Sequence, residues 1–427
     1  MCTAQHILPG EKPPRQPLDA PTTVPYITLT SDHPSSPGSA REVFLVALKL
    51  GLSSFGGPVA HLGYFERVYV RERHWLDAGS YAALVALCQI LPGPASSQTG
   101  FLIGLHRAGW RGAFAAWAGF TLPSAVLMVL AAVLLPRTPG SWLASAEHGL
   151  QLAAVAVVAQ AVWSMGQKLC RGWARSLITS AVAAMLLAYA GAPAQFAALA
   201  LGATAGMLLC RDAAAAPMAS SLKLSARTGW LALGLFLLLL LALPALATAS
   251  PDGIAALAAI FYRSGALVFG GGHVVLPLLH DALVPGWIGE DRFLAGYGLA
   301  QALPGPLFTF SAYLGAASAP AQDVVSWSLC ALVFIFLPGL LLAVAGAALW
   351  QRAAAQPRML AALAGVNAAV VGLLAAALYR PLWTTAVHGT TDLAIALLGF
   401  ILLQLLRLVP LTVVLACVLL RLAADLG

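Results

Sequence analysis

Apolar segments long enough to cross a membrane follow one another almost without interruption from residue 42 to residue 424. A helix needs about 20 predominantly apolar residues to span the hydrocarbon core of a bilayer. Thirteen such segments are predicted, near residues 42–60, 81–105, 112–136, 148–166, 174–191, 193–210, 229–250, 254–280, 292–316, 323–350, 358–378, 389–406 and 408–424. The fold is therefore predicted to be an all-α polytopic membrane protein.

Composition excludes most soluble functions. Hydrophobic residues make up 60% of the chain and charged residues only 9%, whereas soluble domains carry about 25% charged residues. The net charge of +7 is explained by Lys and Arg in cytoplasmic loops, so no nucleic-acid partner is expected. The six cysteines form no CxxC pair and are interpreted as small buried apolar residues, so no metal site and no cofactor are predicted.

The N-terminal segment differs from the rest of the chain. It is rich in Pro, Ser, Thr and Asp and has no apolar core of the signal-peptide type. A segment of this composition cannot bury enough apolar surface to fold. Residues 1–41 are therefore predicted to be a disordered cytoplasmic tail.

Basic residues predict the orientation in the membrane. With a cytoplasmic N-terminus, fifteen Lys and Arg residues fall in inside links and six in outside links, which favours a periplasmic C-terminus. Three of the six, Arg67, Arg71 and Arg73, lie in one segment, "RVYVRERHW". Either this segment folds back into the protein or the first span ends elsewhere.

Five matches in the same order indicate an internal duplication. "FGG" at Phe55–Gly57 returns at Phe269–Gly271, 214 residues later, and "QILPGP" at Gln89–Pro94 returns as "QALPGP" at Gln301–Pro306, 212 residues later. Trp75 matches Trp287, an F-x-L-P element near Pro123 returns near Pro338, and "AAVAVVA" resembles "AAVVGLLA". A nearly constant spacing of this kind is typical of repeats. We expect a first repeat over 42–210, a linker over 211–253 and a second repeat over 254–427.

The extra segment near 229–250 decides how the repeats are oriented. Each repeat holds six predicted spans, and one additional crossing between them inverts the second repeat. The first, second, eighth and ninth spans contain Gly and Pro breaks and are predicted to be discontinuous helices. Inverted repeats with paired broken helices are typical of secondary transporters, whose substrate site lies at the breaks. An isolated Gly would instead favour close helix packing.

Two cations occupy equivalent positions in the apolar segments. Lys49 precedes Phe55 by six residues, and Arg263 precedes Phe269 by six residues. A cation in the middle of a span costs at least about 2.5–3.5 kcal/mol, which favours a role facing an anion. Snorkelling to the interface or a salt bridge is the alternative interpretation.

The residues around the breaks offer donors and positive charge but few carboxylates, which suits an oxyanion better than a metal cation. The predicted substrate-binding residues are Lys49, Ser53, Ser54, Phe55, Gly56, Gly57, Gln89, Pro92, Gly93, Pro94, Ser96, Ser97, Arg263, Phe269, Gly270, Gly271, Gly272, Gln301, Pro304, Gly305, Pro306 and Thr309. His61, His273 and Glu66 are candidates for proton coupling, with a hydrogen-bonded polar residue near the interface as the alternative for each histidine.

Together these motifs resemble the chromate ion transporter family, and in particular its long, two-domain members. The resemblance rests on the duplicated FGG and Q-x-L-P-G-P motifs, the F-x-L-P element and the basic residue ahead of each FGG, and it covers the chain from about residue 41 onward. It implies chromate export across the bacterial inner membrane, chromate resistance and antiparallel halves. The second half departs from the first in having Gly272-His273 at the place of Pro58-Val59, so the halves need not contribute equally.

The sequence also bears on the energy source for transport and on the alternative functions. An interior-negative potential drives a dianion outward, so membrane potential or proton motive force suffices, and no Walker A motif is present. A carrier for sulfate or another tetrahedral oxyanion is the nearest alternative, and a sensory or structural membrane protein is another. An enzyme is not expected, because G-x-S-x-G, H-E-x-x-H and CxxC motifs are missing. The expected partners are a small oxyanion and the lipid bilayer, with a homodimer left open.

Overall fold

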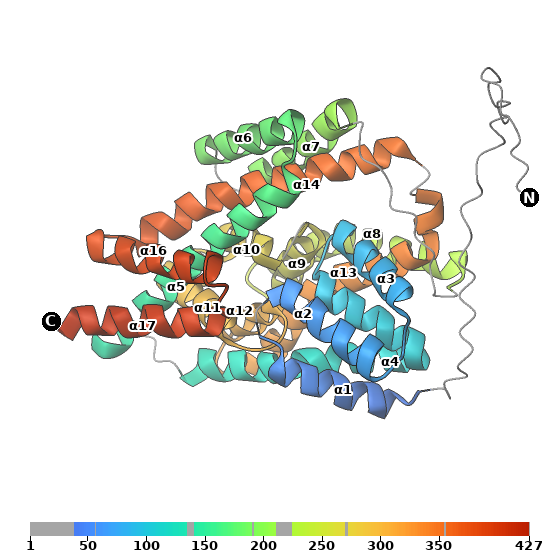
Figure 1. Ribbon diagram of the computed structural model, residues 1–427, viewed down its shortest axis with the longest axis horizontal. Coiled ribbons are helices and arrows are strands. Elements are labelled where there is room, and N and C mark those ends of the chain that lie inside the picture. Colours follow the sequence, from blue (N-terminus) through green and yellow to red (C-terminus); the bar gives the residue numbers. More distant parts are fainter. Residues whose placement is uncertain are drawn as a thin grey trace, which may run out of the picture. The chain divides into compact units, whose positions relative to one another are not determined.

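The computed structural model describes residues 38–55, 57–134, 141–189, 192–210, 224–269, 272–353 and 356–426. Within these ranges every regular element is helical, and the helices belong to one compact unit (Figure 1). Five of them are long and apolar enough to cross a membrane: Ala95–Leu134, Ala144–Leu169, Ala226–Ala247, Val324–Leu349 and Pro357–Ala386. The predicted tail over 1–41 lies outside the described residues up to residue 37.

Helices of the first half follow the predicted segments closely. They are α1 (Ala40–Ser53), α2 (Gly57–Phe65), the π-helical η1 (Glu66–Glu72), α3 (Ala78–Ile90), α4 (Ala95–Leu134), α5 (Ser141–Leu169), α6 (Trp173–Ala188) and α7 (Ala192–Leu209). α8 (Ala226–Ala247) follows, and it exposes a row of large apolar side chains that suits contact with lipid.

The second half repeats this pattern of short and long helices. Its elements are α9 (Ile254–Ala266), η2 (Gly272–Val274), α10 (Val275–Leu283), α11 (Glu290–Ala302), η3 (Leu307–Thr309), α12 (Phe310–Ser318), α13 (Val324–Ala353), α14 (Pro357–Ala377), η4 (Leu378–Trp383), α15 (Thr384–Ala386), α16 (Thr390–Gln404) and α17 (Pro410–Leu426). Each of the four segments expected to be discontinuous is divided into two helices at its Gly and Pro residues.

Local sequence sets where some of these helices begin. Ser39 caps α1 by accepting the N–H of Glu42 at 3.1 Å. Asp77 caps α3, and its carboxylate accepts the N–H and the hydroxyl of Ser80 at 2.9 and 2.6 Å. Partial burial acts to raise the pKa of Asp77, but the hydrogen bonds from Ser80 outweigh it and hold that pKa below its ordinary value.

α4 is a helical hairpin rather than one rod. Ala108 and Gly109 leave the helical conformation, with φ of +62° at Gly109. Gly104 and Gly112 face each other so closely that a Cβ on either would collide with the carbonyl of the other. Residues 95–107 and 110–134 therefore form two antiparallel arms. The first arm is the second part of the expected span 81–105, whose first part is α3, and the second arm corresponds to the expected span 112–136.

The first broken segment returns to the end of the molecule where it starts. Glu42, in the first turn of α1, pairs with Arg73 after η1 at 3.2 Å and with Arg107 at the end of the first α4 arm at 3.4 Å. Both guanidinium groups lie over the ring of Trp75, at 5.7 and 5.4 Å from its centroid. The pairs α1/α2–η1 and α3/first arm of α4 are thus two hairpins that enter the protein and come back.

This geometry corrects one prediction. Arg67, Arg71 and Arg73 were expected on the opposite side of the membrane from Glu42, and that placement is wrong. The physical reason is the break between Ser54 and Gly57, where the chain reverses inside the protein instead of continuing across it. Of the two alternatives left open, the segment that folds back is the one observed.

Equivalent contacts occur in the second half. Trp287, between α10 and α11, lies 5.7 Å from Trp327 at the start of α13, measured between ring centroids. The carbonyl of Ile254, at the start of α9, accepts the thiol of Cys330 at 3.8 Å. The beginnings of α9, α11 and α13 therefore lie at one end, as the beginnings of α1, α3 and the second α4 arm do.

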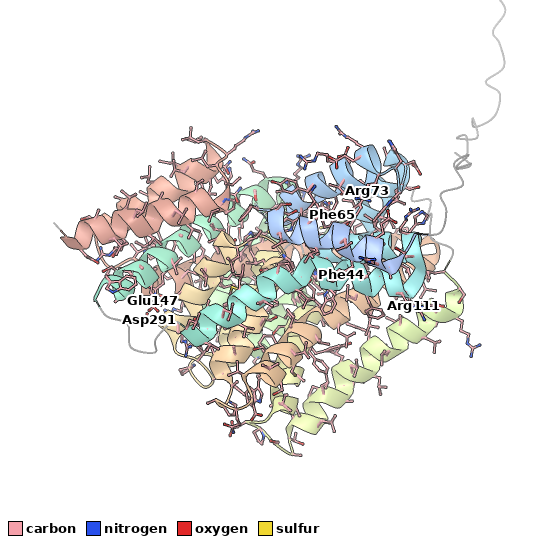
Figure 2. The ribbon with its side chains drawn as sticks, turned by 90° about the horizontal axis from the view of Figure 1, so that it is seen from below. Phe44, Phe65, Arg73, Arg111, Glu147 and Asp291 are labelled. Atoms are coloured by element: carbon pink, nitrogen blue, oxygen red, sulfur yellow. The ribbon has the colours of Figure 1, made fainter. Side chains whose placement is uncertain are left out.

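The two sets of ends are opposite each other. Arg292, in the first turn of α11, donates to the carbonyl of Ala132 at the far end of α4 at 2.6 Å. Figure 2 shows Arg73 and Arg111 toward one end of the helices and Glu147 and Asp291 toward the other. We call the end with Arg73, Arg107 and Arg111 the basic end, and the end with Glu147 and Asp291 the acidic end.

The fold-back can be checked by chemical accessibility. In a variant without native cysteines, we expect Arg67→Cys and Arg111→Cys to react with an impermeant maleimide from the same side of the membrane, because both lie at the basic end. Asp323→Cys, before α13, serves as the opposite control. Labelling of Arg67→Cys only from the side that labels Asp323→Cys would contradict the hairpin.

Candidate functional site

The tips of the broken helices meet inside the protein and exchange backbone hydrogen bonds. The N–H of Gly93 donates to the carbonyl of Val268 at 2.6 Å, and the N–H of Gly305 donates to the carbonyl of Ser54 at 3.0 Å. Gly93 and Gly305 are equivalent glycines of the two LPGP motifs, and each acceptor directly precedes the FGG motif of the other half. Each half therefore completes the break of the other.

Close packing behind these tips is also reciprocal. A Cβ on Gly93 would lie 2.8 Å from Cα of Gly339, and one on Gly305 would lie 3.2 Å from Cβ of Ser124. Both glycines have positive φ, +119° and +98°. The amide of Gln98 donates to the carbonyls of Pro92 and Gly339 at 2.8 Å each. Glycine is required at the tips both for conformation and for space.

A cavity of about 380 Å³ lies against the tips. Helices of both halves line it, and its polar lining is neutral or basic. These polar lining residues are Gln89, Gln160, Ser164, Lys168, His273, Gln301 and Asn367. No carboxylate is found among the described residues that line it, so the cavity offers donors and one full positive charge to an anion.

Two amide side chains in this lining each have a polar atom that is free to form a hydrogen bond. The Nε2 of Gln301 and the Oδ1 of Asn367 are buried atoms that make no hydrogen bond within the described protein. Buried polar atoms in native proteins nearly always have a partner, so such atoms indicate a bound ligand or water. Gln301 is also the counterpart of Gln89 in the repeat, and both side chains reach the same cavity.

Several predicted site residues are brought together here. Gly57, Gln89, Gly93, His273 and Gln301 line the cavity. Pro92, Pro94, Pro304 and Pro306 are buried in the tips beside Gly93 and Gly305, while Phe55 and Phe269 are partly buried and Gly272 begins η2. Gly56, Gly270 and Gly271 lie outside the described residues.

The predicted hydroxyl donors lie behind the cavity lining. Ser54, Ser96, Ser97 and Thr309 are all buried, and Thr309 shares a 2.7 Å hydrogen bond with Ser124. The hydroxyls of Ser54 and Ser97 make no hydrogen bond within the described protein. These four residues are placed to support the tips, and their role in substrate binding stays a prediction.

The two predicted cations lie apart from the cavity lining. Lys49 and Ser53 are exposed on α1, where the hydroxyl of Ser53 donates to the carbonyl of Lys49 at 2.8 Å. Arg263 is half-buried on α9, with its guanidinium 5.7 Å from the ring centroid of Phe196. Their role toward an anion stays a prediction, but the structure does not bring them to the glutamines.

The three proton-coupling candidates have different surroundings. His61 is buried, with Nε2 3.2 Å from the carbonyl of Ser54 and Nδ1 3.4 Å from the hydroxyl of Ser96, which suits a neutral ring. Glu66 pairs with Arg71 at 2.6 Å, away from the cavity lining. His273 lines the cavity, and its Nδ1 lies 2.8 Å from the hydroxyl of Tyr297. Of the three, His273 is the one found in the cavity lining, and the role of each in proton coupling stays a prediction.

Sequence reasoning missed four polar lining residues, Gln160, Ser164, Lys168 and Asn367. A signal for three of them was available, because Gln160, Ser164 and Lys168 are spaced four residues apart in a largely apolar part of the chain. That spacing places them on one face, and Lys168 was instead assigned to an inside link. Asn367 is an isolated polar residue in the apolar part of α14, and nothing local distinguishes it.

The chain is similar to known chromate transport proteins, although no solved structure matches it. A probable chromate transport protein of Synechococcus elongatus is 27% identical over 372 residues, covering 85% of this chain and 89% of the relative. Chromate transport proteins of Pseudomonas aeruginosa and Cupriavidus metallidurans are 29% and 26% identical, covering 81% and 88% of this chain and 82% and 90% of the relatives. The chromate transporter family model matches residues 41–207 and again 255–422. This multi-pass membrane protein belongs to the chromate transporter family.

Proposed function

We propose that this protein exports chromate across the bacterial inner membrane and thereby confers chromate resistance. The observation that carries the proposal is the cavity at the helix tips, which is lined by amides, a hydroxyl and one ammonium group and by no described carboxylate. The three relatives described above are named as chromate transport proteins, one of them as a probable one. Those names refer to chromate and not to sulfate, so chromate is the substrate we propose.

The chemistry of the lining suits this substrate. Chromate is a tetrahedral dianion whose oxygens accept hydrogen bonds, and hydrogen bonds to charged groups are stronger than neutral ones. Gln89 and Gln301 can donate from two different helices, while Lys168 supplies charge. A divalent cation would instead require carboxylates.

The proposed topology has two inverted repeats with the boundaries expected from the sequence, 42–210 and 254–427. Support comes from the reciprocal contacts at the tips and from Arg292, which ties the start of α11 to the far end of α4. We propose that the first, second, eighth and ninth predicted spans are re-entrant hairpins and that the other nine cross. Replacing four crossings leaves the parity unchanged, so the termini stay on opposite sides.

The basic end is proposed to face the cytoplasm, following the positive-inside rule. With Arg67, Arg71 and Arg73 moved to this side, and Arg292, which was counted inside, moved to the acidic end, the bias is still stronger than the sequence count alone. α5 has its first turns at the acidic end near Glu147 and is long enough to cross, so Lys168 in its last turn lies toward the basic end. The cavity would therefore load from the cytoplasm, as export requires.

Membrane potential can drive this transport. An interior-negative potential of 100 mV is worth about 2.3 kcal/mol for each charge, so a leaving dianion gains roughly 4–5 kcal/mol. His273 is the residue through which a proton could be coupled, because its ring lines the cavity beside Tyr297.

Everted membrane vesicles test the direction and the substrate. Vesicles containing the protein are expected to accumulate radiolabelled chromate when the lumen is made positive, and empty vesicles are not. Accumulation only in right-side-out vesicles would reverse the direction. Equal inhibition by sulfate and by unlabelled chromate would show a general oxyanion carrier.

Gln301 can be tested by removing its side-chain amide, whose Nε2 has no partner in the described protein. Gln301→Leu is expected to lower the initial rate of chromate transport about tenfold, because a hydrogen bond to a charged group is worth roughly 1.5–3 kcal/mol. Gln167→Leu, an exposed position on α5, is the matched control and should transport like the wild type. Proteoliposomes with equal protein content provide the rates, and equal rates for the two variants would refute the role of Gln301.

A further inference from the structure

Two histidines and a carboxylate converge at the acidic end, away from the transport cavity. His148 lies in α5, His388 lies in the link before α16, and Asp392 lies in the first turn of α16. Their ligand atoms all lie within 4.8 Å of one another. Residues more than 200 positions apart in the chain thus present two imidazoles and one carboxylate to a common point.

The spacing is close to that of ligands around one metal ion. Nε2 of His148 lies 3.7 Å from Oδ2 of Asp392, and two ligands of a tetrahedral Zn²⁺ are about 3.3–3.4 Å apart for bonds of about 2.0–2.1 Å. The two imidazole centroids are 5.5 Å apart. Without metal, Nε2 of His148 donates to the carbonyl of Ala386 at 2.8 Å, so an ion would take the place of that proton.

The charge balance favours a cation. Arg421 donates to Oδ1 of Asp392 at 3.2 Å and to Asp425 at 2.6 Å, so one guanidinium is shared between two carboxylates. The group as a whole carries a net charge of −1 when both histidines are neutral. Oδ2 of Asp392 remains on the side of His148 and is positioned by the N–H of His388 at 3.0 Å. Partners of this kind orient metal-ligating carboxylates.

We propose that His148, His388 and Asp392 bind a divalent transition-metal ion of the Zn²⁺ class. Two imidazoles and a carboxylate are a common ligand set for Zn²⁺, with the fourth position left to water. The ion joins α5 to α16, and Arg421 extends the connection to α17. The same three helices contribute Lys168, Leu403 and Pro410 to the cavity lining, so the ion fixes their relative positions at the opposite end.

Metal titration of the untagged, full-length protein in detergent tests this site. We expect calorimetry with ZnCl₂ to show one saturable site in the wild type, and His388→Ala to weaken it at least about tenfold, as loss of a ligand should. His388 is exposed, so this variant should keep the wild-type melting temperature without metal. Zn²⁺ should raise the melting temperature of the wild type but not that of His388→Ala.

His280→Asn is the matched control, because His280 also lies at 3.3 and 3.5 Å from two carboxylates, Glu290 and Asp281. It should retain the site. A wild type without saturable binding, or a site lost in His280→Asn and kept in His388→Ala, would overturn the proposal. These measurements need no chromate, so they stand apart from the proposed transport function.

Discussion

Lys168→Glu should reduce the initial rate of chromate transport by at least about tenfold. Lys168 is the one cation among the described residues of the cavity lining. A unit charge about 10 Å from a dianion contributes roughly 1–3 kcal/mol, depending on how far water screens it. Reversing the charge changes the interaction free energy by twice this amount. Because Lys168 is exposed, water screens its charge, and we expect an interaction in the lower part of the roughly 1–3 kcal/mol range. Rates in proteoliposomes at equal protein content measure the effect.

Lys49→Glu is the matched control, because Lys49 is also an exposed lysine on an apolar helix but does not line the cavity. It should transport within about twofold of the wild type, and Lys168→Arg should keep most of the activity. If Lys49→Glu abolished transport and Lys168→Glu did not, the sequence hypothesis of paired cations at Lys49 and Arg263 would replace the cavity described above.

Gly93→Ala is expected to destabilise the protein more than Gly305→Ala or Gly57→Ala, the same change at the other described glycines of the breaks that have positive φ. Its φ of +119° is unfavourable for a residue with a side chain, and the new Cβ would lie 2.8 Å from Cα of Gly339. Backbone strain of roughly 1–3 kcal/mol and overpacking of roughly 1–3 kcal/mol act together here. A clearly lower melting temperature in detergent should follow, with loss of transport.

Gly57→Ala separates the two causes. Gly57 has a φ of +76°, but nothing lies within 4 Å of an added Cβ, so only backbone strain of roughly 1–2 kcal/mol remains. Its melting temperature should fall much less than that of Gly93→Ala. Equal shifts in the two variants would mean that contact with Gly339 does not matter.

Much of the helical pattern could be predicted because its causes are local. The segment predicted near 229–250 is α8 at 226–247, and that near 358–378 is α14 at 357–377. Apolar length sets such boundaries directly. The breaks at Gly57 and Gly93 were also predictable, because Gly and Pro residues interrupt helices. Both glycines indeed have positive φ.

The path of the chain after each break could not be predicted. A broken helix can continue across the membrane or turn back, and the choice depends on long-range contacts such as Arg73 with Glu42. The direction in which a side chain points from its helix also could not be predicted from the sequence. Lys49 was recognised as a cation in an apolar segment, but which face of α1 it occupies depends on α4, which packs on the other face.

The exchanged backbone bonds between Gly93 and Val268 and between Gly305 and Ser54 restrict how this gene can be divided. A polypeptide ending near residue 210 would keep the N–H of Gly93 and the carbonyl of Ser54 but lose both partners. Inside a bilayer such orphaned groups each cost several kcal/mol. A half-length product would therefore need a second half-length product, and two unlinked pieces synthesised together should reconstitute the transporter where either alone is degraded.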